Sequence, residues 1–165
     1  MGENELIRLY EFSGWRCDSC RGLITSIEAG WVEWLVSERG NDREVFCGLH
    51  LVHRRPIQQN GHKQACRYNP LKEFRSAKTI VEGFPLERFV GPDGLMLVFS
   101  LLAAGFLPKA QVLELAKRMQ IPGYEVAHNL LRELIPSGVV TPFLGSGFYL
   151  QSEIREVIAC ARRRK

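Results

Sequence analysis

Two cysteines stand three positions apart near the start of the chain, in the hexapeptide Cys17-Asp18-Ser19-Cys20-Arg21-Gly22. Thiolates at this spacing converge on one metal ion from a tight turn, and a tetrahedral zinc site needs two more Cys or His ligands from elsewhere. The chain supplies candidates for them further along, namely Cys47, His50, His53, His62 and Cys66. The spacing therefore predicts a structural metal site that holds a small module together.

The composition indicates a folded protein whose cysteines stay reduced. The chain has 165 residues, of which 45% are hydrophobic, which is enough for one ordinary domain or two small ones. No apolar run approaches the roughly 18 residues of a membrane span, and the N-terminal residues lack the basic and apolar regions of a secretory signal. We expect a cytoplasmic protein. In that compartment its five cysteines favour metal binding over disulfides.

The first part of the chain has the pattern of a β-hairpin. Residues 25–36 and 44–53 are rich in β-branched and aromatic side chains, and the polar residues 37–43 between them can turn the chain. We therefore predict a β-rich zinc-binding module over residues 1–55, with metal ligands extending to residue 66. Its type is expected to be zinc-ribbon-like or treble-clef-like.

Two sets of ligands can complete the zinc site. In a hairpin that turns near residues 40–41, His53 returns to the end that holds the cysteine pair, while Cys47 lies towards the far tip. Side chains alternate along a strand, so Cys47 and His50 point to opposite faces. We therefore favour Cys17, Cys20, His53 and Cys66, and the pair Cys47 and His50 remains the alternative because its spacing is familiar. Four protein ligands leave no place for water, which makes the predicted zinc structural.

A basic segment follows the hairpin. Between residues 54 and 78 the only acidic residue is Glu73, and seven residues are positively charged: Arg54, Arg55, Lys63, Arg67, Lys72, Arg75 and Lys78. We interpret residues 56–90 as a basic connector. Its charges either face water in a loop and short helix or follow the phosphates of a nucleic acid.

The last part of the chain, residues 91–165, is mainly helical. Apolar periodicity and proline or glycine signals predict helices over 95–104, 108–120 and 124–135, strands over 139–144 and 148–150, and a final helix from Ser152 as N-cap. This order of elements resembles the winged helix-turn-helix superfamily. The resemblance implies that the third helix is a recognition helix, whose solvent face carries Glu125, His128, Asn129 and Arg132. The basic terminus adds further predicted nucleic-acid-binding residues, namely Arg162, Arg163, Arg164 and Lys165.

A second resemblance concerns the metal module. The cysteine pair, upstream of Leu51-Val52-His53-Arg54-Arg55-Pro56, is similar to the opening of an HNH-type treble-clef nuclease. That resemblance implies a catalytic divalent metal and a water-activating role for His53. The sequence departs from the pattern because no second Cys-x2-Cys or Cys-x2-His pair follows the asparagine position of the motif, and no acidic residue or second histidine that could serve as a ligand stands beside His53.

These patterns predict an α+β protein, made of a small β-rich zinc module and a C-terminal winged-helix domain. The net charge of +4 suits a nucleic-acid partner. The expected function is non-enzymatic: binding of nucleic acid, DNA in particular, as a regulator or an accessory factor in DNA processing. No catalytic triad, phosphate loop or nucleotide fingerprint points to a small-molecule substrate. The alternative is a protein-interaction adaptor in a larger assembly, with Trp31 and Trp34 at the interface.

Overall fold

The computed structural model describes residues 14–39, 43–59, 62–134, 143–144 and 147–163. Helices and strands are mixed, as the α+β prediction requires, and the chain forms two compact units, Gly14–Gln120 and Ile121–Lys165. None of the helices in these described ranges has both the length and the apolar character to cross a membrane.

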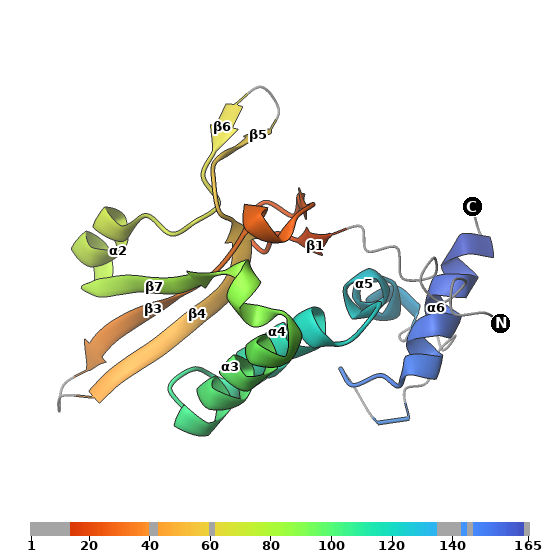
Figure 1. Ribbon diagram of the computed structural model, residues 1–165. Helices are drawn as coiled ribbons and strands as arrows, with labels where there is room; N and C mark the ends of the chain where they lie inside the picture. The colour runs from red at the N-terminus through yellow and green to blue at the C-terminus, as the bar shows by residue number, and fades with distance from the viewer. Residues whose placement is uncertain (1–13, 40–42, 60–61, 135–142, 145–146, 164–165) are drawn as a thin grey trace. The chain divides into compact units, whose positions relative to one another are not determined.

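A three-stranded antiparallel sheet forms the centre of the first unit (Figure 1). Its strands are β3 (Gly30–Arg39), β4 (Arg43–His53) and β7 (Thr79–Pro85), in the order β4-β3-β7. The predicted hairpin is confirmed, since β3 pairs with β4 and Gly30 lies opposite His53. The strand begins later than the prediction of residue 25, because Ile27–Ala29 form a short 3-10 helix, η1.

The register of the hairpin changes by one residue along its length. Glu33 lies opposite His50, but Leu35 lies opposite Cys47, with an irregularity between them. On β4 this irregularity coincides with Gly48, whose φ of 64° is in the left-handed region that favours glycine. A regular hairpin that turns at residues 40–41 would place Trp34 opposite Cys47, whereas the structure places Leu35 there. A bulge of this kind changes which side chains share a face of the sheet.

The segment predicted as a basic connector contains regular structure. It holds β5 (Ile57–Gln59), β6 (His62–Gln64), α2 (Pro70–Ala77), β7 and the 3-10 helix η2 (Leu86–Phe89). Asn69 caps α2 by accepting a hydrogen bond from the backbone N–H of Lys72 at 3.1 Å. Because β7 pairs with β3 along its whole length, residues 79–85 of the predicted connector are an integral part of the three-stranded sheet. The charge pattern of the sequence had obscured that strand.

Helices α3 (Gly91–Ala104) and α4 (Lys109–Gln120) belong to the same unit as the sheet. Their buried side chains Val98, Val112 and Leu115 share one core with Val32 and Trp34 of β3. The predicted domain boundary between residues 90 and 91 therefore differs from the division between the compact units, which follows Gln120. Trp34, expected at an adaptor interface, is only 5% exposed and contributes to this core.

The second unit contains α5 (Tyr124–Leu134) and α6 (Gln151–Arg163). Its core consists of Tyr124, Ala127, Leu131, Ile154, Val157 and Ile158. Helix α6 begins one residue before the predicted N-cap, Ser152. Leu150 precedes the first residue of the helix, and its backbone N–H donates a hydrogen bond to the Glu153 carboxylate at 2.6 Å.

Much of the predicted β-hairpin of the winged helix, residues 139–142 and 145–146, lies outside the described residues. The described residues 148–150, predicted as its second strand, have no strand pairing. The first two helices of the predicted domain pack with the sheet in the other compact unit. The winged helix therefore stays a prediction for the C-terminal part of the chain.

Candidate metal centre

The Cys17–Cys20 pair lies in a tight loop between two short strands. Strands β1 (Trp15–Arg16) and β2 (Leu23–Ile24) pair with each other and bring the ends of this loop together. The loop is closed by hydrogen bonds from the Cys17 N–H to the Gly22 carbonyl and from the Arg21 N–H to the Cys17 carbonyl, both 2.9 Å. Arg21 takes a left-handed conformation with a φ of 62°. These short-range bonds set the two thiol groups side by side.

Backbone N–H groups of the loop point at the cysteine sulfurs. The Cys20 N–H lies 3.5 Å from the Cys17 Sγ, and the Gly22 N–H lies 3.3 Å from the Cys20 Sγ. Donors in this position stabilise the thiolate form, which is the form that binds a metal. Gly22 also leaves room for the site, because a Cβ at this position would lie 3.2 Å from the Cys20 Sγ.

Four side chains from three separate parts of the sequence converge on one point. The ligand atoms of Cys17, Cys20, His53 and Cys66 all lie within 4.8 Å of one another, and these four residues are called the metal centre below. Cys17, His53 and Cys66 are 0%, 7% and 4% exposed, while Cys20 is half-buried. The structure thus brings together the favoured ligand set. Such a group can hold a metal ion.

Two distances within the metal centre match those between ligands of a tetrahedral zinc ion. The His53 Nδ1 lies 3.5 Å from the Cys20 Sγ and 3.6 Å from the Cys66 Sγ. Sulfur and nitrogen ligands at about 2.3 and 2.0–2.1 Å from a zinc ion, at the tetrahedral angle, are about 3.6 Å apart. Three soft thiolates and one imidazole are also a ligand set that zinc prefers.

A second hydrogen bond orients the histidine ring. The His53 Nε2 lies 3.2 Å from the carbonyl oxygen of Leu23 on β2. The Nε2–H donates to this carbonyl, so the Nδ1 keeps its lone pair towards the three sulfurs. The strand that closes the cysteine loop thereby also selects the tautomer suited to metal binding.

Without a cation, the thiol group of Cys66 resists ionisation. Burial raises the pKa of Cys66 to about 12, with further contributions from the neighbouring Cys20 and Cys17. Three thiolates so close together need a positive charge between them. A bound metal ion would supply that charge and deprotonate the thiols.

The alternative pair, Cys47 and His50, is not part of this group. The His50 Nε2 lies 3.0 Å from the Glu33 Oε1, and its ring stacks on Tyr68 with the centroids 4.2 Å apart. Cys47 lies three residues before His50 in β4, opposite Leu35 of β3. His50 therefore belongs to a separate polar cluster on the sheet.

Glu33 is the centre of that cluster and was missed as a functional residue in the sequence. Its side chain is fully buried and accepts hydrogen bonds from the Arg67 Nε at 3.0 Å and from the Tyr68 backbone N–H. Burial raises the pKa of Glu33, but the hydrogen bonds from His50, Tyr68 and Arg67 outweigh it and hold the pKa below its ordinary value. Because Arg67 and Tyr68 directly follow Cys66, Glu33 fixes the chain next to a predicted ligand. The available signal was an acidic residue between Val32 and Trp34 in an apolar strand.

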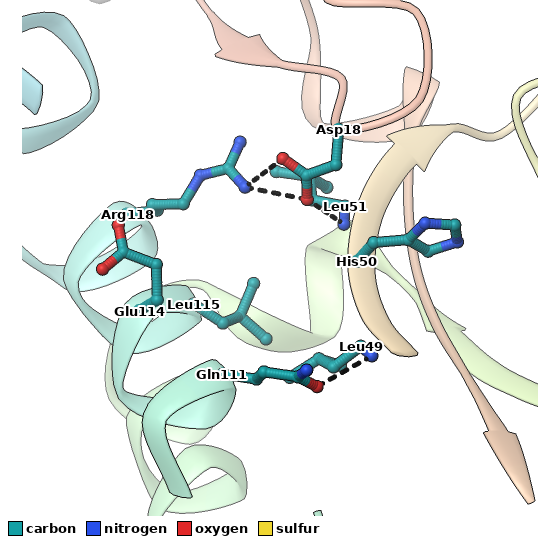
Figure 2. A pocket seen from close by; sticks show the side chains of 8 residues that line it. All are labelled: Asp18, Leu49, His50, Leu51, Gln111, Glu114, Leu115 and Arg118. Atoms are coloured by element: carbon teal, nitrogen blue, oxygen red, sulfur yellow. Dashed lines mark hydrogen bonds and ion pairs between the residues drawn. The ribbon is translucent and has the colours of Figure 1, made fainter. Parts of the chain in front are cut away.

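Asp18 links the cysteine loop to two other elements (Figure 2). Its carboxylate accepts a hydrogen bond from the Leu51 N–H on β4 at 2.7 Å, and its own N–H donates to the Leu51 carbonyl at 2.8 Å. The Arg118 Nη1 on α4 lies 2.8 and 3.0 Å from the two carboxylate oxygens. A small pocket lies between these groups, and the His50 side chain points away from Asp18 and Arg118.

The predicted nucleic-acid-binding residues of the C-terminal unit are described only in part. His128 is half-buried on α5 and stacks on Tyr124, with the ring centroids 5.3 Å apart. The side chains of Asn129, Arg132, Arg162 and Arg163, and the whole of Arg164 and Lys165, lie outside the described residues. His128 thus packs on Tyr124, although the sequence predicted it on the solvent face of the helix.

No family model, curated protein or solved structure matches this chain. The function is therefore inferred from the metal centre and from the charged and apolar side chains of the chain.

Proposed function

We propose that the metal centre binds one structural zinc ion and that the protein is a non-enzymatic, nucleic-acid-binding protein, a regulator or accessory factor in DNA processing. The observation that carries the first half is the pair of 3.5 and 3.6 Å distances from the His53 Nδ1 to two thiol sulfurs. They match ligands that share a tetrahedral ion. Four buried or half-buried protein ligands give a closed site, which is typical of structural zinc.

Cobalt substitution tests the zinc proposal directly. Protein refolded with Co²⁺ in place of Zn²⁺ should show the visible absorption of a tetrahedral ion together with sulfur-to-metal charge transfer. Added Zn²⁺ should bleach both signals, because zinc binds such sites more tightly than cobalt does. Elemental analysis of protein purified without chelator should find one zinc per chain. A spectrum of octahedral cobalt, or no stoichiometric zinc, would contradict the proposal.

The charge of the segment that follows His53 supports nucleic acid as the partner. The residues that follow His53 and Cys66 include seven exposed cationic side chains: Arg54, Arg55, Lys63, Arg67, Lys72, Arg75 and Lys78. Only one acidic residue, Glu73, lies in the same stretch. A surface with such an excess of positive charge attracts the phosphates of a nucleic acid.

Salt dependence tests the nucleic-acid proposal. The affinity of the full chain for a fluorescein-labelled DNA duplex should fall steeply as salt rises, because each neutralised phosphate releases counterions. Absence of binding even at low salt, where phosphate attraction is strongest, would rule out this function.

The C-terminal unit offers a second surface for the same partner. If α5 acts as the recognition helix of a winged helix, Asn129 and Arg132 would contact bases, and the basic terminus from Arg162 to Lys165 would contact phosphates. The support for this is the polar stripe on α5 and the cluster of four terminal cations in the sequence.

One observation favours the adaptor function as the alternative. Four large apolar side chains of β7 and α3 are substantially exposed, namely Ile80, Phe84, Met96 and Phe99. Exposed apolar groups of this kind are found at protein interfaces. An apolar interface would keep its affinity as salt rises, so the salt titration distinguishes the adaptor from the nucleic-acid binder.

The nuclease alternative has less support. Both ring nitrogens of His53 are engaged, Nδ1 with the thiols and Nε2 with the Leu23 carbonyl. A histidine held in this way serves as a ligand, and the proposal therefore assigns it no proton transfer. The expected result is no cleavage of plasmid DNA in the presence of Mg²⁺.

A further inference from the structure

The two later residues of the metal centre bracket a protruding ribbon. His53 ends β4 and Cys66 follows β6. The described residues between them, 54–59 and 62–65, are called the finger below and contain the paired strands β5 and β6. Figure 1 shows this ribbon standing away from the three-stranded sheet. Both ends of the finger therefore lie at the metal centre, where a bound metal ion would hold them together.

The base of the finger is fixed to the unit by several contacts. The Arg54 N–H donates a hydrogen bond to the Ala29 carbonyl at 2.8 Å, and Ile57 packs against the main hydrophobic core. Closing a loop at its base lowers the entropy of its open states, so the metal ion would hold the ribbon in one orientation.

The surface of the finger is polar and cationic. Arg54 and Arg55 are exposed at its base, and Gln58 and Lys63 are exposed and lie opposite each other in the ribbon. Because side chains alternate along a strand, Gln58 and Lys63 share the face opposite to Ile57, which packs on the core. The outward face thus combines cations with an amide that can both donate and accept.

We propose that the finger enters the major groove of double-stranded DNA, with Gln58 and Lys63 at the base edges and Arg54 and Arg55 at the phosphates. A two-stranded ribbon fits the major groove, which is about 12 Å wide. Gln pairs with adenine through two hydrogen bonds, and Lys contacts guanine acceptors. The inference rests on the proposed nucleic-acid function and names the element and the groove that would serve it.

Charge neutralisation tests the finger against a matched control. The double variant Arg55→Gln, Lys63→Gln should bind a fluorescein-labelled mixed-sequence DNA duplex about tenfold more weakly, and its salt slope should be smaller by about 1 because the phosphate contact of Arg55 is lost. The control is Arg88→Gln, Lys109→Gln, which removes the same charge from exposed residues of η2 and α4. It should bind as the unchanged protein does. Equal zinc content and circular dichroism for all three proteins show that the fold is intact.

Groove-specific competitors test the assignment of the groove. Methyl green, which occupies the major groove, should displace the protein from the duplex, whereas netropsin, which occupies the minor groove, should not.

The outcomes separate the finger from the proposed function. If the unchanged protein binds but the finger variant binds equally well, or if only netropsin competes, the inference is overturned and the nucleic-acid function stands. If the unchanged protein does not bind duplex DNA at low salt, the proposed function itself fails.

Discussion

Asp18 and Arg118 are 100 residues apart in the sequence and form an ion pair with N–O distances of 2.8 and 3.0 Å. Asp18 lies between the two cysteines of the loop, and Arg118 lies in the last turn of α4. The Arg118 Nη2 also donates to the Arg16 carbonyl at 2.6 Å, which attaches α4 to the strand that leads into the loop. Figure 2 shows the guanidinium and the carboxylate in direct contact in the lining of the pocket. Arg118 therefore attaches α4 directly to the loop that carries two of the metal-centre cysteines.

We predict that Arg118→Gln lowers the free energy of unfolding by about 1–3 kcal/mol, because a charge-assisted pair and a hydrogen bond to a carbonyl are lost together. Arg118→Lys should recover only part of the loss, since lysine lacks the planar fork. Urea denaturation followed by tryptophan fluorescence measures the effect, and Arg88→Gln is the exposed control. Equal urea midpoints for Arg118→Gln and the unchanged protein would contradict the link.

The second prediction separates the two ligand sets. Cys17→Ser and Cys66→Ser should each release zinc and destabilise the unit Gly14–Gln120, because the free energy of zinc binding is part of the folding free energy in such sites. Cys47→Ala should retain the metal, since Cys47 is outside the metal centre. Elemental analysis after gel filtration provides the measurement. Loss of zinc from Cys47→Ala with retention in Cys66→Ser would mean that the other ligand pair closes the site.

The third prediction concerns pH. The pKa of Glu33 is held below its ordinary value of 4.5 in the folded protein. The stabilisation that this provides is fully present above pH 4.5 and is lost as the pH falls through the lower, folded-state pKa. Glu33→Gln should therefore be less stable than the unchanged protein at pH 7, and the difference should shrink on acidification below 4.5.

Urea denaturation over a range of pH, with excess zinc in every sample, measures the difference between the two proteins. Acid also protonates the thiolates, but that effect is common to both proteins and cancels in the comparison. A difference in stability that stays constant from pH 7 to acidic pH would show that the charge of Glu33 is not the source.

The fourth prediction tests the packing of α3 on η2. Alanine normally stabilises a helix by about 1 kcal/mol relative to glycine. At Gly94, however, a Cβ would lie 2.1 Å from the carbonyl carbon of Phe89, a backbone atom that cannot turn aside. Gly94→Ala should therefore lower the melting temperature. Ser100→Ala on the exposed side of the same helix should leave it unchanged or raise it slightly, and an equal rise in both variants would show that α3 does not pack this closely.

The sequence was sufficient for features that depend on neighbouring residues. The Cys17–Cys20 spacing sets two thiols in one loop, and alternation with a polar turn produced the β3–β4 hairpin. The same hairpin geometry placed His53, rather than His50, near the cysteines, as the structure shows. Helical periodicity also located α4, α5 and the C-terminal end of α3 closely, because each helix buries apolar side chains, whereas α3 begins four residues before the predicted start at residue 95.

Long-range pairing decided what the sequence left open. Strand β7 was hidden in a charged segment, and only its partner β3 reveals it. Helices α3 and α4 carry the pattern of a separate helical domain, yet their apolar side chains complete the core of the sheet. Glu33 is buried because Arg67, Tyr68 and His50 satisfy it, and Asp18 meets Arg118 across most of the chain. Periodicity shows that a face is apolar, but the surface that covers it is chosen by the packing of the whole unit.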